Sequence, residues 1–318
     1  MRRLRFVPDV TTIDFMGRAR LWVALSILLT VGSIVLIFTR GFNLGVDFRG
    51  GALVIASTPA PEDVGRFREV LTGLNFGEVA VTEVSDDTGA GRFTVLMRLG
   101  IADPNANAAQ VVDTVRAELS AAFPGIQYLQ VDSVGSKVSS ELVRNGALAV
   151  VLAFLGIMVY VWLRFEWQFA VGAVLSVMHD ALVTLGLFSL LQLEFNLTIV
   201  AAVLTVIGYS INDTVVIFDR VRELLRKYKK TPLPQLMNMA LNETLSRTVM
   251  TSSTTLIALL AIFFFGGDVV HGFAIAMIFG GVLVGTYSTI YVACATVLWL
   301  GVRRDWSGAE AASAAVKP

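Results

Sequence analysis

Six long apolar runs constrain the fold of this chain more than any other feature. They cover residues 21–38, 146–163, 169–193, 197–218, 248–265 and 273–300. A transmembrane helix needs about 20 predominantly apolar residues. In lipid, a spanning segment must satisfy its own backbone polar groups, which a helix does within one segment. The runs therefore predict a polytopic α-helical membrane protein with six transmembrane helices.

Basic clusters set the expected orientation of these helices. They precede the first run, follow the fourth and follow the sixth: Arg2, Arg3, Arg5, Arg18 and Arg20; Arg226, Lys227, Lys229 and Lys230; Arg303 and Arg304. Six crossings bring all three clusters to one side, and the positive-inside rule makes that side the cytoplasm. The first run lacks a small-residue cleavage motif, so we expect a retained anchor and not a signal peptide.

The expected segments follow from this topology. They are a cytoplasmic N-terminal segment (1–20), a first transmembrane helix (21–38), an extracytoplasmic domain (39–142), a five-helix bundle (143–302) and a cytoplasmic tail (303–318). Within the polar block, helical spacing in 61–74 and 107–123 separates strand-like runs at 51–57, 77–84, 92–99 and 126–134. The order β-α-β-β-α-β predicts a ferredoxin-like α+β domain. That fold hosts many functions, so it says little about chemistry.

Composition excludes several function classes. Only 16% of residues are charged, and 25 basic residues balance 25 acidic ones. The balance gives no nucleic-acid footprint. The single cysteine, Cys294, excludes an intrachain disulfide, and His179 and His271 are too dispersed to suggest a metal site. No nucleophile triad or nucleotide loop is visible, so we expect a transport component and not an enzyme, with no cofactor.

A carboxylate inside the fourth apolar run is the leading site candidate. A charge near the centre of a membrane helix costs about 2.5–3.5 kcal/mol on insertion scales. Asp213 lies sixteen residues after Leu197, roughly 24 Å along the helix at about 1.5 Å per residue, and Arg247 enters the next span at a similar depth. A nearby arginine favours an ionised aspartate and desolvation favours a neutral one. The pair could therefore bind and release a proton, or serve as a static ion pair between helices.

Other polar residues in the spans are accessory candidates. Asn212 shares a helical side with Asp213, and Thr251 follows Arg247 by one turn. His179 and Asp180 lie about 20 Å above the start of the third span at about 1.5 Å per residue. A proton relay, a structural hydrogen bond and a contact with a partner subunit all remain open for that pair. Gly281 and Gly285 are typical of close helix packing.

Several ordered motifs carry a family resemblance. The segments are 45–51 (GVDFRGG), 134–138 (VGSKV), 164–167 (RFEW), 179–180 (HD), 208–220 (GYSINDTVVIFDR), 242–248 (NETLSRT), 251–255 (TSSTT) and 266–267 (GG). With these segments in this order along its length, the chain resembles the SecD/SecF family of the bacterial Sec translocon, within the resistance–nodulation–division superfamily. The family's intramembrane carboxylate maps to Asp213 and its basic partner to Arg247.

The resemblance implies a function and partners. It implies a heterodimer with SecD beside the SecYEG channel in the bacterial inner membrane, with both termini cytoplasmic and membrane lipid around the spans; YajC and YidC are possible further partners. It also implies that the proton-motive force drives the external domain to promote export of unfolded preproteins. Residues 41–50 and 134–140 would then be hinges. The alternatives are a small-molecule or lipid exporter of the same superfamily and a non-transporting assembly subunit.

Overall fold

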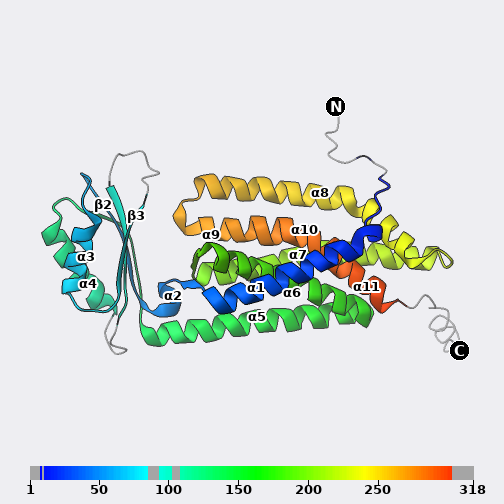
Figure 1. Ribbon diagram of the computed structural model, residues 1–318, viewed down its shortest axis with the longest axis horizontal. Coiled ribbons are helices and arrows are strands. Elements are labelled where there is room, and N and C mark those ends of the chain that lie inside the picture. The colour runs from blue at the N-terminus through cyan, green and yellow to red at the C-terminus, as the bar shows by residue number, and fades with distance from the viewer. Residues whose placement is uncertain (1–7, 9–10, 85–92, 102–107, 303–318) are drawn as a thin grey trace, which may run out of the picture. The chain divides into compact units, whose positions relative to one another are not determined.

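A computed structural model describes residues 8, 11–84, 93–101 and 108–302 (Figure 1). The expected cytoplasmic tail 303–318 and most of residues 1–10 lie outside the described residues. The chain divides into two compact units. A helical unit comprises Met1–Phe42, Val150–Leu193 and Thr198–Pro318, and an α+β unit comprises Asn43–Ala149 and Glu194–Leu197.

Six helices are long and apolar enough to cross a membrane, as the apolar runs predict. Five of them are α1 (Ala19–Arg40), α5 (Ser136–Arg164), α6 (Trp167–Leu191), α7 (Leu197–Lys227) and α8 (Leu233–Phe265), and a short 3₁₀ turn, η1 (Met16–Arg18), precedes α1. Most begin or end beyond the apolar runs. The largest difference is in α8, which starts fifteen residues before position 248. A helix is continued by its backbone hydrogen bonds, so polar residues can extend it past the apolar segment.

The sixth span is the irregular one. It consists of α9 (Asp268–Ala276), a π-helical stretch η2 (Met277–Val284), α10 (Gly285–Ser288), a second π-helical stretch η3 (Thr289–Ala293) and α11 (Cys294–Leu300). Wider π turns occur mostly as short interruptions of α-helices. Glycines bring this span close to α6 and α7: a Cβ on Gly280 would collide with the side chain of Thr184, and one on Gly285 would lie 3.3 Å from the Ser210 Cβ. Both contacts fit the predicted small-residue packing.

The helical unit's largest apolar cluster lies where α6, α7, α8 and the last span meet. Its aromatic centre includes Phe169 and Phe218, whose ring centroids are 5.0 Å apart in an edge-on arrangement. Aromatic pairs prefer edge-to-face or offset-stacked arrangements over a direct face-to-face sandwich. Cys294 is fully buried in the same cluster.

The α+β unit has the predicted strand and helix order. Its main elements are β2 (Gly51–Thr58), α3 (Val64–Gly73), β3 (Val79–Val84), β4 (Phe93–Leu99), α4 (Ala108–Ala122) and β5 (Gln127–Val134). The antiparallel sheet has the order β3-β4-β2-β5, as expected for a ferredoxin-like domain. Both helices cover one side of the sheet (Figure 1), where Phe67 stacks on Phe123 with centroids 3.8 Å apart. The side chain of Asp63 caps α3 by accepting a hydrogen bond from Gly65 N.

Two short strands were not predicted from the sequence. Strand β1 (Asn43–Leu44) pairs in parallel with β6 (Glu194–Phe195), and the helical turn α2 (Val46–Arg49) follows β1. The first of these strands falls in the expected hinge 41–50, and the second lies between the apolar runs 169–193 and 197–218. Two-residue strands carry no alternation that a sequence can show, and this pairing joins segments about 150 residues apart. It places residues 194–197 in the α+β unit.

Candidate functional site

The structure places Asp213 inside the helical unit. Its side chain is only 6% exposed, on the side of α7 that carries the buried residues Ser210, Thr214 and Ile217 at three- and four-residue steps. Arg247 on α8 stabilises the charged form of this carboxyl electrostatically. The Thr251 hydroxyl, one turn further along α8, does so through a hydrogen bond. Thr251 itself donates to its own helix, 2.9 Å from the Thr248 carbonyl.

Asp213 and Arg247 are not joined by a direct ion pair. Among the described residues, the salt bridges do not include this pair. Arg247 is exposed on α8, and Asn212 is exposed on α7 although its neighbour Asp213 is buried. Successive residues on a helix point about 100° apart, so the predicted accessory residue Asn212 lies on a different face from the carboxylate.

Asp180 lies at the centre of a buried polar cluster. Its Oδ2 accepts hydrogen bonds from Ser210 Oγ of α7 at 2.6 Å and from Ser288 Oγ of α10 at 2.8 Å. Its Oδ1 lies 3.0 Å from His179 Nδ1, and Ser176 Oγ donates to Ser288 Oγ at 2.9 Å. Two serine hydroxyls thus donate to one carboxylate oxygen of Asp180, and the other oxygen contacts the imidazole of His179. The cluster ties α6 to α7 and to the last span.

His179 has one ring nitrogen in this cluster and one outside it. The side chain is buried, and its Nε2 has no hydrogen-bond partner in the structure. The Tyr287 ring lies 6.1 Å away, with its hydroxyl hydrogen-bonded to α1. The structure therefore joins the predicted pair His179–Asp180 to α7 by a hydrogen bond, and separates it from Asn212.

Sequence reasoning missed the hydroxyl residues that complete this arrangement. Ser210 lies one helical turn before Asp213, and Thr214 one position after it, where its Oγ1 lies 2.9 Å from Thr289 Oγ1 of the last span. Small hydroxyl residues in apolar spans are common packing residues, which hides such contacts.

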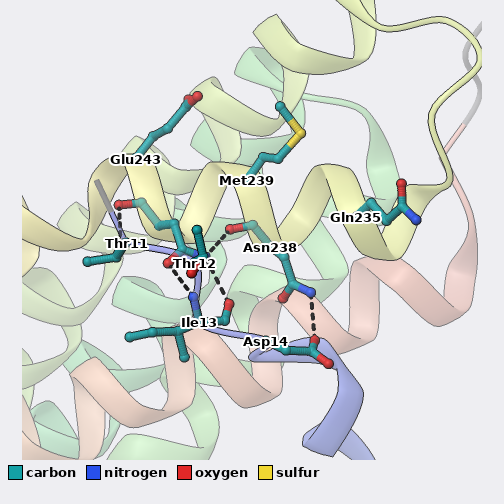
Figure 2. Close-up of a pocket in the computed structure, with 9 residues that line it drawn as sticks. Thr11, Thr12, Ile13, Asp14, Gln235, Asn238, Met239 and Glu243 are labelled. Carbon is teal, nitrogen blue, oxygen red and sulfur yellow. Dashed lines mark hydrogen bonds between the residues drawn. The ribbon is translucent and has the colours of Figure 1, made fainter. Parts of the chain in front are cut away.

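The N-terminal segment makes a second polar site on α8 (Figure 2). The side chain of Asn238 accepts from the Phe15 and Met16 amides and donates to Asp14 Oδ1 at 2.7 Å, as Figure 2 shows for Asp14 and Asn238. A cavity of about 560 Å³ lies beside these contacts. Hydrogen bonds from the Gly17 amide and from Asn238 lower the pKa of the exposed Asp14. These bonds hold the segment before α1 against α8.

Metal binding finds no support in this arrangement. Within the described ranges, no group of three or more His, Cys, Asp or Glu side chains could hold a metal ion. A buried carboxylate opposite an arginine can instead bind and release a proton. The helical unit thus holds two buried carboxylates: Asp213, which has few partners, and Asp180, which has several.

Comparison with known proteins identifies the family. The model for "Protein export membrane protein SecD/SecF, C-terminal" matches residues 114–303, and the model for the "SecD/SecF GG Motif" matches residues 35–57. Protein translocase subunits SecF from Ketogulonicigenium vulgare and Cereibacter sphaeroides are each 48% identical, over 96% and 95% of this chain and 94% of theirs. SecF from Rickettsia akari is 39% identical over 96% of each chain. The chain belongs to the SecF family.

Solved structures agree with this SecF assignment. SecDF from Thermus thermophilus, described as a translocon-associated membrane protein, is 36% identical with a TM-score of 0.79 and is matched by 91% of this chain. SecDF in a super-membrane-facing form gives a TM-score of 0.67 over the whole chain. This SecF-family chain covers 39% and 42% of those SecDF chains. Family and helices together make it a multi-pass inner-membrane component of the protein translocase, with SecD as partner.

The GG-motif match coincides with a folded region. Residues 35–57 run from the end of α1 through β1 and α2 into β2. Gly51 has φ +136°, where a Cβ would also collide with the Leu99 carbonyl. Only glycine adopts that backbone conformation without strain, so this part of the SecF motif has a direct steric reason.

Proposed function

We propose that this chain, together with SecD, uses protons crossing the membrane at Asp213 and Arg247 to promote preprotein export through SecYEG. The observation that carries the proposal is a buried carboxylate without a direct ion pair, acted on by an arginine of the next helix. A small change in the separation of α7 and α8 would change how strongly Arg247 stabilises the charged form. Proton binding and helix movement would then be linked.

The contrast with Asp180 supports this choice of site. Two serine hydroxyls and His179 Nδ1 surround the Asp180 carboxyl, so its hydrogen bonds hold α6, α7 and α10 together in one arrangement. We assign His179 and Asp180 an accessory role: they hold α7 at Ser210, one turn from Asp213. Thr251 would stabilise the charged state of Asp213 from α8.

Exposed polar groups in the spans support a partner in the membrane. Arg247 and Asn212 are both exposed in this chain, and charged side chains within membrane helices almost always face protein or water and not lipid. The matched SecDF chains are more than twice as long. We therefore propose that a SecD half in trans covers Arg247 and Asn212, with both termini cytoplasmic and the α+β unit outside.

The test is export driven by a proton gradient. Inner-membrane vesicles containing SecYEG, SecD and this chain are scored for completion of preprotein translocation with and without the gradient. Asp213→Asn keeps size and hydrogen bonding but cannot cycle a proton, so the gradient-dependent part of export should disappear while SecD still co-purifies. Asp219→Asn is the matched control on the same helix, where the carboxylate is half-exposed and pairs with Arg164.

The outcome separates this function from its main alternative. A static assembly subunit would tolerate Asp213→Asn as well as Asp219→Asn, provided that the complex forms. Normal gradient-dependent export by the Asp213→Asn variant would therefore refute the proton-coupling role. Loss of export together with loss of SecD would instead indicate an assembly defect.

A further inference from the structure

The first turn of α7 is held by residues of the α+β unit. Leu197 is the first residue of α7 and also the last residue of the 194–197 segment that belongs to the α+β unit. Strand β6 in that segment pairs in parallel with β1, and the Gly45 amide donates to the Phe195 carbonyl at 2.9 Å. The rings of Phe48 and Phe195 stack with centroids 5.6 Å apart. We call these contacts the β1–β6 joint.

An acidic residue from the GG-motif segment caps α7. The Oδ2 atom of Asp47 accepts a hydrogen bond from Leu197 N at 2.8 Å. The first amides of a helix have no partner within the helix, and a carboxylate there also interacts favourably with the helix dipole. Such caps normally come from the residue that precedes the helix. This one comes from a residue 150 positions earlier, so the start of α7 depends on a distant segment.

An ion pair on the sheet completes the joint. Arg98 of β4 pairs with Glu194 of β6, and their side chains are only 28% and 26% exposed. Gly45 permits the close approach, because a Cβ there would lie 2.7 Å from Glu194 Oε1 and 3.2 Å from Asn196 Cβ. The joint thus combines a strand pair, a helix cap, a ring stack and a partly buried ion pair.

We propose that Asp47, Arg98 and Glu194 are positioning residues that keep residues 194–197, which end at the first residue of α7, fixed within the α+β unit, so that this segment moves with that unit. Residues 41–50 would then not act as the flexible hinge expected from their glycines. The consequence for transport rests on the proposed function, since Asp213 lies sixteen residues further along α7. A proton bound there would act on the α+β unit through its own helix.

Charge reversal tests the joint in the complex with SecD. Arg98→Glu and Glu194→Arg each place like charges together, whereas the double variant restores an opposite pair. Each single change should speed amide hydrogen exchange in residues 194–200 on the order of tenfold, as expected for directly coupled residues, and reduce gradient-dependent export. The double variant should recover both. Control reversals at Glu62, just before α3, and its partner Arg66 on α3, whose side chains are 32% and 54% exposed, should leave both readouts unchanged.

The exchange readout keeps this inference separate from the proposed function. If Asp213→Asn leaves export normal but the single reversals still loosen residues 194–200, the joint stands and proton coupling fails. If the single reversals leave exchange at the level of the Glu62 and Arg66 controls, the joint is wrong whatever export does.

A disulfide across the strand pair distinguishes a joint from a hinge. Leu44 and Phe195 are register partners, so Leu44→Cys with Phe195→Cys would lock the two strands together, and the reduced form of the same variant is its control. A permanent joint predicts equal export by the oxidised and reduced forms. If oxidation blocks gradient-dependent export and reduction restores it, the strands must separate during transport and the proposal is overturned.

Discussion

Two carboxylates inside the helical unit have opposite surroundings. Asp180 is fully buried, and side chains from α6, α7 and α10 surround both of its oxygens. Asp213 is nearly as buried, yet the cation that acts on it belongs to an exposed side chain and makes no direct ion pair with it. Both residues bear the cost of a charge within the membrane, but only Asp180 is hydrogen-bonded to side chains of several helices.

The difference shows how a membrane bundle can separate stability from function. A carboxylate bonded to side chains of three helices is stabilised in one arrangement of those helices, and a movement of α7 disturbs it. A carboxylate without a direct ion pair is not held to one arrangement in this way. Burial alone therefore does not distinguish the two carboxylates; the number and origin of their partners do.

Removing Arg247 should have the largest effect. Arg247→Ala should reduce gradient-dependent export more than tenfold, because Asp213 loses the charge that acts on it. Arg247→Lys should keep part of the activity, since it retains the charge but not the planar fork. Lys230→Ala, which removes an exposed charge after α7, is the control in the same vesicle assay. Full export by the alanine variant would place Arg247 outside the mechanism.

Asp180→Asn should mainly reduce stability. Asparagine has one acceptor oxygen where the carboxylate has two, so the buried hydrogen bonds around Asp180 would be rearranged, and a buried polar group left unsatisfied costs about 1–3 kcal/mol. The purified complex should therefore unfold at lower temperature, while Asp213→Asn should leave the midpoint nearly unchanged. Equal midpoints for the two variants would remove the distinction between the sites.

Gly280→Ala should disturb the Asp180 cluster from the opposite side. A methyl group there would collide with Thr184, whose Oγ1 donates to the Asp180 carbonyl at 2.6 Å. Overpacking typically costs about 1–3 kcal/mol, and thermal unfolding of the complex would report it. At Gly208 on α7 a Cβ meets nothing within 4 Å in this chain. Gly208→Ala is therefore the matched variant, and an equal loss of stability there would mean that a partner packs on that face.

Asp14 should give the smallest effect, as an exposed carboxylate with two donors. Its pKa is lowered from the ordinary value of 3.8 by the Gly17 amide and Asn238. A lowered pKa stabilises the docked segment above that ordinary value, and this contribution is lost as the pH falls through the lower, folded-state value. Protease sensitivity of the segment before α1 should rise on acidification below about pH 4 and not in Asp14→Asn. No difference between the two proteins would exclude Asp14 as the titrating group.

The sequence predicts the parts of this fold that depend on local patterns. Six apolar runs give six helices, and alternation in the polar block gives the strand order of the α+β unit. The β1–β6 joint escapes prediction because its strands are two residues long and come from distant segments. The polar start of α8 and the π-helical stretches are likewise invisible to hydropathy, which reports burial in lipid and not backbone hydrogen bonding.

The sequence marks some of the site candidates and hides the contacts of others. Asp213 and Arg247 are conspicuous because a charge in an apolar run is costly. Helical spacing alone put Asn212 on the side of Asp213, yet the structure exposes one and buries the other. The partners of Asp180 at Ser210 and Ser288 lie 30 and 108 residues away. Nothing local marks a serine as a donor to a distant carboxylate.

The burial of Cys294 has a practical consequence for thiol chemistry. It is the chain's single cysteine and it has no exposed surface, and buried structural thiols are chemically inert compared with exposed ones. A maleimide or spin label added to the intact complex should therefore leave this chain unmodified until a cysteine is placed where a reporter is wanted. The natural sequence is in effect its own unlabelled background, so distances to the α+β unit could be followed without first replacing a core residue.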